Sequence, residues 1–218
     1  MRYYSARKLI KRILIAALLI SKPLYPLPSL DGLIREIEAA YSSISDLSAD
    51  FTQVTHIALL EKKIDEKGRL VWKVPGRFLI EYNGDRPRKY ISNGKKIWVY
   101  TPGEKEAETY SATSKNVSKD ALEFLNGFLK IRSNYNIVSW KMGANGTAEL
   151  VLTPREAGAP YTKLECRFGN DRLLKDVTIQ NTNGNISRYT FSNISINNGI
   201  GDDLFTLPKG IKELKGEE

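Results

Sequence analysis

The chain has 218 residues, of which 41% are apolar, enough for one domain with a sizeable core. Its net charge of +8 is typical of proteins that bind nucleic acids, but six of its 33 basic residues precede residue 30, where no acidic residue occurs. The rest of the chain contains the other 27 basic residues and 25 acidic ones, so it is nearly neutral. This distribution removes the main argument for a nucleic-acid partner.

Residues 1–29 have the pattern of a secretory signal peptide. Basic residues up to Arg12 precede an apolar run of eight residues at 13–20. Eight residues are too few to cross about 30 Å of hydrocarbon as a helix, but they suit the apolar region of a signal peptide. We therefore expect export to the periplasm, with cleavage near Ser21 or Ser29 and a single domain over 30–218. An uncleaved amino-terminal anchor is the alternative.

The next segment has the spacing of an amphipathic helix. Apolar side chains between Leu30 and Ile44 recur every three or four residues, which predicts a helix over 31–44 with Asp31 as its N-cap. Such a helix must pack its apolar face against another element.

From residue 47 the apolar period changes to two, the period of β-strands. Six strands are predicted before residue 111, and Asn83-Gly84 and Asn93-Gly94 favour tight hairpin turns. Their ranges are 47–59, 69–74, 77–82, 88–92, 96–101 and 107–110. Strand 96–101 has bulky side chains on both faces, so either both faces of the sheet are covered or one of them faces a ligand.

A second helix is predicted over 118–131, behind Ser118 as its N-cap. Gly127 in its middle costs about 1 kcal/mol relative to Ala, so the helix depends on apolar contacts. The residues expected to make them are Leu122, Leu125, Phe128 and Leu129.

Five further strands complete the pattern, at 135–140, 147–153, 161–168, 172–181 and 185–197. Short turns between them predict an antiparallel meander. A twisted sheet of about eleven strands tends to curl, so we predict a mainly β (α+β) fold: a barrel or partial barrel with both helices on its concave side. A filled core and a ligand cavity are both compatible with this arrangement.

Catalytic signatures are lacking in the sequence. It has one His and one Cys and contains no Gly-x-Ser-x-Gly, phosphate-binding loop or dinucleotide-binding motif. Cys166 alternates with apolar residues, as a buried thiol in a strand would. We therefore expect no enzyme activity, no cofactor and no bound metal.

Apolar side chains on successive strands are the candidate ligand contacts. They are Phe51, Trp72, Phe78, Ile80, Tyr82, Trp98 and Tyr100. Core packing is the alternative for each of them.

Five segments in the same order resemble the outer-membrane lipoprotein carrier protein (LolA) family. They are Leu-Ser-Ala-Asp-Phe-Thr-Gln (47–53), Gly-Arg-Leu-Val-Trp-Lys-Val-Pro-Gly-Arg-Phe (68–78), Ser-Asn-Gly-Lys-Lys-Ile-Trp-Val-Tyr-Thr-Pro (92–102), Leu-Thr-Pro (152–154) and Phe-Thr-Leu-Pro-Lys-Gly-Ile (205–211). The third segment is the most specific.

This resemblance implies an unclosed β-barrel with a helical lid and a cavity for the acyl chains of lipoproteins. It also implies two partners, an inner-membrane lipoprotein-releasing ABC transporter and an outer-membrane acceptor, and a carrier that acts as a monomer. One position departs from the family pattern, because Val74 replaces the Arg that precedes the Pro and holds the lid shut. Closure would then rest on apolar contacts or on a displaced Arg. A LolA-like carrier or sensor for another lipid or glycolipid is the alternative function.

Overall fold

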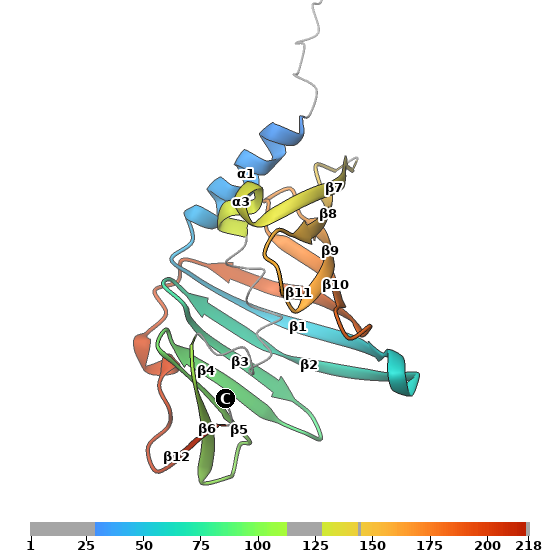
Figure 1. Cartoon of the computed structure of the whole chain (residues 1–218). Coiled ribbons are helices and arrows are strands. Elements are labelled where there is room, and N and C mark those ends of the chain that lie inside the picture. Colours follow the sequence, from blue (N-terminus) through green and yellow to red (C-terminus); the bar gives the residue numbers. More distant parts are fainter. Residues whose placement is uncertain (1–28, 113–127, 144, 217–218) are drawn as a thin grey trace, which may run out of the picture.

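A single curled sheet dominates the computed structural model, which describes residues 29–112, 128–143 and 145–216 (Figure 1). Its strand order is β12-β6-β5-β4-β3-β2-β1-β11-β10-β9-β8-β7. The strands are β1 (Asp46–Ile57), β2 (Lys62–Lys73), β3 (Arg77–Asn83), β4 (Arg88–Asn93), β5 (Lys96–Tyr100), β6 (Glu106–Ser111), β7 (Tyr135–Met142), β8 (Ala148–Pro154), β9 (Tyr161–Phe168), β10 (Leu174–Asn181), β11 (Ile186–Ile196) and β12 (Lys212–Lys215).

The two halves of the chain meet along β1 and β11, which pair antiparallel with Leu47 opposite Ile196. β7 and β12 form the two edges of the sheet, so the barrel is unclosed, as predicted. The eleven predicted strands are present. A twelfth strand, β12, pairs parallel with β6 and is not predicted from the sequence, because Lys-Glu-Leu-Lys is short and has no buried face.

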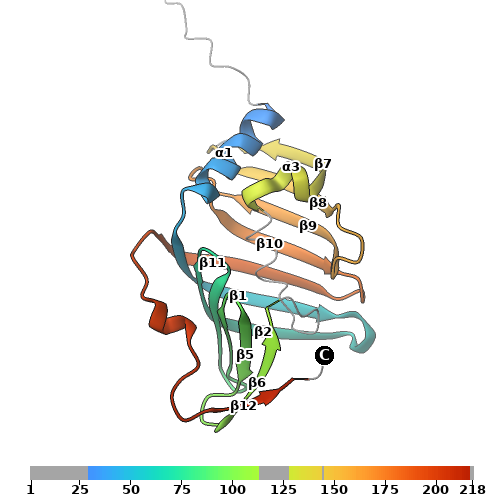
Figure 2. The same cartoon turned by 60° about the vertical axis from the view of Figure 1, so that its left-hand side comes forward.

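Helix α1 (Leu30–Ser42) lies on the concave side of the sheet, where Leu33, Ile34 and Ile37 are buried (Figure 2). Its N-cap is Ser29, whose hydroxyl accepts a hydrogen bond from the backbone N–H of Gly32 at 3.0 Å. The prediction of Asp31 as the cap is wrong by two residues. Asp31 lies instead in the first turn, where a carboxylate is favoured by the helix dipole.

Most of the predicted 118–131 helix lies outside the described residues. What the structure describes there is a 3₁₀ turn, η2 (Phe128–Lys130), followed by the short helix α3 (Ile131–Asn134). Phe128 and Ile131 are fully buried in the same core as α1. These turns therefore pack on the concave side together with α1.

Apolar clusters cover both faces of the sheet. The larger cluster lies between the concave face, α1 and η2. The smaller one lies on the opposite face, where Phe205 of the 3₁₀ helix η3 (Asp202–Phe205) packs against β2–β6. In β5, Ile97 belongs to the first cluster and Trp98 to the second, so both faces of this strand are covered.

Candidate ligand-binding site

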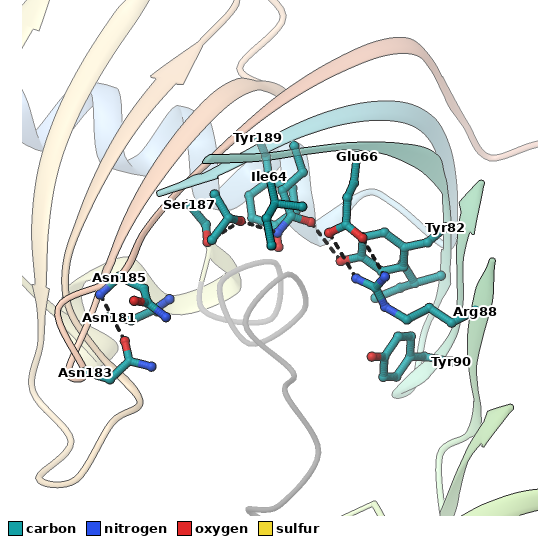
Figure 3. A pocket seen from close by; sticks show the side chains of 13 residues that line it. Ile64, Glu66, Tyr82, Arg88, Tyr90, Asn181, Asn183, Asn185, Ser187 and Tyr189 are labelled. Carbon is teal, nitrogen blue, oxygen red and sulfur yellow. Dashed lines mark hydrogen bonds and ion pairs between the residues drawn. The ribbon is translucent and has the colours of Figure 1, made fainter. Parts of the chain in front are cut away.

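A cavity of about 330 Å³ opens on the concave side of the sheet (Figure 3). This volume is at the lower end of the range for small-molecule sites. The lining residues come from β1 to β4, from the end of β10, from β11 and from the turn between β10 and β11: Gln53, Thr55, Ile64, Glu66, Ile80, Tyr82, Arg88, Tyr90, Asn181, Asn183, Asn185, Ser187 and Tyr189.

Strand alternation selects these side chains. Phe51 of β1 faces the core, and Gln53 and Thr55 continue the same face towards the open end of the strand. On β3, Ile80 and Tyr82 point inwards while Leu79 belongs to the opposite cluster. The cavity is thus the polar continuation of the apolar concave face.

Aromatic rings link the core to the cavity. Phe51 meets Tyr82 at a centroid distance of 5.2 Å and Tyr189 at 6.0 Å, and Tyr82 meets Tyr90 at 6.1 Å. These distances and mostly edge-on orientations are those of favourable aromatic pairs. The rings give the cavity a firm apolar border.

Hydrogen-bonded side chains cross the floor of the cavity. The Tyr82 hydroxyl donates to Gln53 Oε1 at 3.0 Å, and Gln53 Nε2 donates to Thr55 Oγ1 at 2.8 Å. The Thr55 and Ser187 hydroxyls are 3.1 Å apart and share a hydrogen bond. Burial raises the pKa of Tyr82 to about 12, so its phenol stays protonated and keeps its donor at neutral pH.

Two charged residues line the cavity, and they neutralise each other. Arg88 donates two hydrogen bonds to the Glu66 carboxylate, at 2.5 and 3.1 Å, and its guanidinium lies 3.8 Å from the centre of the Tyr82 ring. A bidentate pair of this kind fixes both side chains. The lining is therefore polar but has no net charge.

The structure divides the predicted ligand contacts between the two faces of the sheet. Ile80 and Tyr82 line the cavity. Phe51, Trp72 and Phe78 are buried in the adjoining concave core.

Trp98 and Tyr100 require a correction, because they lie on the opposite face, in the cluster around Phe205. Strand β5 places alternate residues on opposite faces, and its inward residues are Ile97 and Val99. The structure therefore removes Trp98 and Tyr100 from the ligand-facing set.

The predicted lid residues are described only in part. Leu122 and Leu125 lie outside the described residues, and the side chain of Leu129 is likewise not described. Phe128 is buried between Tyr41 of α1 and Phe168 of β9, with ring centroids 5.3 and 5.2 Å away. It thus belongs to the concave core.

The basic residues beside Val74 bind the carboxy-terminal segment. Lys73 Nζ and Arg77 Nη1 each lie 2.6 Å from Asp202 Oδ1 of η3, and Arg77 also donates to the carbonyl oxygen of Val74 at 2.8 Å. This ion-pair cluster holds η3 over the outer face. In this structure, Arg77 does not act as the displaced Arg of a concave-side latch.

The polar lining, which includes Gln53, Glu66, Arg88 and Asn181, is not among the predicted ligand contacts, because an acyl ligand predicts apolar contacts. A signal was available in strand 47–59, since every second residue from Leu47 faces inwards and the series becomes polar after Phe51. Asn181 and Asn185 end and begin predicted strands and Asn183 lies in the turn between them, so none of the three is predicted as a ligand contact.

Other chemistry finds little support in the described part of the chain. No three His, Cys, Asp or Glu side chains there are grouped as metal ligands. The Cys166 thiol is buried, which raises its pKa and makes it a poor nucleophile. Among the helices of the described ranges, none has the length and apolarity to cross a membrane.

These features define a class of protein, a half-barrel with a helix packed on its concave face and a cavity open on the same face. The family described as outer membrane lipoprotein carrier protein LolA matches residues 42–208, and the chain belongs to this family.

The sequences of individual relatives match this chain over most of their length. The outer-membrane lipoprotein carrier proteins of Methylobacillus flagellatus and Hahella chejuensis are 24% and 23% identical to this chain. The matches cover 83% and 95% of this chain, and 87% and 98% of the relatives. A crystal structure of a conserved protein from Thermus thermophilus has the same fold, with a TM-score of 0.53 at 12% identity; the match covers 87% of this chain and all of that one.

Proposed function

We propose that this protein carries the acyl chains of lipoproteins across the periplasm, from the inner to the outer membrane. The observation that carries the proposal is a cavity that continues the apolar concave face, in a chain that belongs to the lipoprotein carrier family. The protein would act without catalysis, as a monomer. Its partners would be an inner-membrane ABC transporter that releases lipoproteins and an outer-membrane acceptor.

Burial of the acyl chain would provide the binding energy. Each CH₂ group removed from water contributes about 0.8 kcal/mol, so a few buried methylenes can hold a ligand that still dissociates on delivery. Ile80 and Tyr82 would contact the chain where the cavity meets the core, and Phe51 and Phe78 lie behind them. A small apolar void of about 10 Å³ lies in the concave core beside α1, lined by Tyr41, Leu70 and Phe191 among others.

Lid closure would rest on apolar contacts in this chain. Lys73 and Arg77 are engaged with Asp202 on the outer face, and Val74 offers no hydrogen bond from its side chain. The residues proposed to make the contacts are Leu122, Leu125, Phe128 and Leu129.

Two neighbouring residues of β3 allow a test with a matched control. Ile80 lines the cavity, whereas Leu79 packs into the outer cluster, and both are buried. In titrations with a fluorescent acyl probe, Ile80→Ala should weaken binding about tenfold, the scale of losing a few buried methyl groups. Leu79→Ala should lower the free energy of unfolding about as much as Ile80→Ala does, because both remove a buried aliphatic side chain. It should leave the affinity for the probe unchanged. Equal affinity of both variants and the parent protein would contradict the proposed cavity.

The polar lining favours one second candidate, a carrier of the same fold for another lipid or glycolipid. Mass spectrometry of lipids extracted from protein purified from its host separates the two functions. Diacylated peptides would support lipoprotein transport, and free lipid or glycolipid would support the second candidate.

A further inference from the structure

We propose that the 330 Å³ cavity is a subsite for the polar headgroup of an acylated ligand, and that it selects a neutral headgroup bearing N–H or O–H donors. The inference rests on the proposed function in one respect, since the acyl chain is taken to lie on the concave face beside it. What it adds is the chemistry of the group that follows the chain.

Charge gives the first argument. Of the thirteen lining residues, Glu66 and Arg88 are the charged ones, and the two hydrogen bonds between them occupy the Nη1–Nη2 edge of the guanidinium, one of the two edges that a carboxylate or phosphate can use. An anionic headgroup would have to break this pair or remain close to the Glu66 carboxylate. The cavity therefore disfavours anions, and a neutral headgroup avoids both costs.

The wall opposite Arg88 gives the second argument. The Asn183 side-chain oxygen accepts from the backbone N–H of Asn185 at 3.0 Å (Figure 3). The Asn185 side-chain oxygen accepts from the N–H of Ala58 at 3.1 Å. Both bonds use the amide oxygen, and neither NH₂ group makes a hydrogen bond within the described ranges, so both can donate to a ligand. This wall can thus bind a carbonyl or hydroxyl oxygen.

Asn181 supplies the complementary group. Its Oδ1 atom is buried and has no hydrogen-bond partner within the described part of the chain. An unpaired buried acceptor is unfavourable, so a headgroup that reaches this atom with an N–H or O–H, once the Asn181 side chain turns towards the cavity, gains a hydrogen bond that the folded chain does not supply. Donors and an acceptor on one wall match an amide or a hydroxyl group, which has both functions.

The aromatic rings at the border of the cavity indicate how the ligand would be oriented. Tyr82 and Tyr189 both contact Phe51 of the concave core and both line the cavity. A chain leaving the core between these rings would bring its first polar group towards the Asn wall. Two kinds of ligand carry such a group, acylated peptides with their amide linkage and glycerolipids or glycolipids with their hydroxyls.

The test uses four probes with the same twelve-carbon chain: N-lauroylglycinamide, 1-lauroylglycerol, methyl laurate, which has no donor, and laurate, which is an anion. The variant is Asn181→Ala, and the control is Gln180→Ala, the neighbouring amide residue, which does not line the cavity. Asn181→Ala should bind at least one donor-bearing probe about five- to tenfold more weakly, the scale of one hydrogen bond, with methyl laurate affinity unchanged. A larger loss for the amide indicates an acylated peptide, and a larger loss for the glyceryl ester indicates a hydroxyl-bearing lipid.

Two outcomes overturn the inference. Unchanged affinity of Asn181→Ala for both donor-bearing probes would show that the Asn wall does not bind the headgroup. Laurate anion binding to the parent protein as tightly as 1-lauroylglycerol would remove the selection for neutral groups. In either case, binding of methyl laurate leaves the acyl-carrier function standing, whereas failure of every probe to bind would contradict that function itself.

Discussion

The ring of Phe51 on β1 contacts the ring of Tyr82 on β3, although β2 lies between these strands. The contact is possible because β2 places Gly68 opposite both residues. A Cβ atom at Gly68 would stand 2.6 Å from Phe51 Cζ and would overlap the carbonyl oxygen of Glu81. The missing side chain thus lets two aromatic residues meet across an intervening strand at the border of the cavity.

Gly68→Ala should therefore destabilise the protein. Overpacking of a filled site costs about 1 to 3 kcal/mol, and part of the obstruction here is backbone, which yields less readily than a side chain. The measurement is the free energy of unfolding from urea denaturation. Arg69→Ala on the exposed face of the same strand is the control and should change it by less than about 0.5 kcal/mol. A Gly68→Ala variant as stable as the parent would show that the rings move apart freely.

Gly68 also illustrates what the sequence could and could not predict. Apolar periods of two residues predict the eleven strands, and a period of three to four predicts the first helix, because burial of one face leaves a regular apolar spacing in the sequence. It could not show that Phe51 and Tyr82 touch, since that contact depends on the register of three strands. The sequence also does not predict which apolar side chains of a strand face the cavity. Trp98 and Ile97 are both apolar, and only the assembled sheet assigns them to opposite clusters.

The Tyr41 hydroxyl joins α1 to the start of β10. It accepts a hydrogen bond from the backbone N–H of Leu174 at 3.1 Å, and burial raises the pKa of the phenol well above its ordinary value. Tyr41→Phe keeps the ring contact with Phe128 but leaves the buried N–H unpaired. The free energy of unfolding should fall by about 1 to 3 kcal/mol.

Amide hydrogen exchange provides a second measurement on Tyr41→Phe. The Leu174 amide should exchange faster than in the parent protein, because its acceptor has been removed. Thr178, whose amide lies further along the same strand, serves as the internal control and should be unaffected. Unchanged stability together with slow exchange at Leu174 would show that another acceptor replaces the phenol.

Asp46, at the start of β1, holds the segment that follows β11. Its carboxylate accepts hydrogen bonds from the backbone N–H groups of Asn198 at 2.8 Å and Gly199 at 3.1 Å. Burial raises the pKa of this carboxyl, but the backbone donors outweigh that effect, so its pKa lies below the ordinary value. The ionised carboxylate of Asp46 is therefore more stable in the folded protein than in the unfolded chain.

The sign of the pH dependence follows from this lowered pKa. The stabilisation by Asp46 is fully present above the unfolded pKa of about 3.9 and is lost as the pH falls through the lower, folded value. Asp46→Asn should be less stable than the parent by about 1 to 2 kcal/mol at pH 7, because an amide oxygen is a weaker acceptor and its NH₂ group faces two donors. Measured by urea denaturation, this difference should shrink as the pH falls from 5 to 2. Asp85→Asn, in the exposed turn between β3 and β4, is the control and should follow the parent curve. A difference that stays constant over this pH range would show that Asp46 acts through packing and not through its charge.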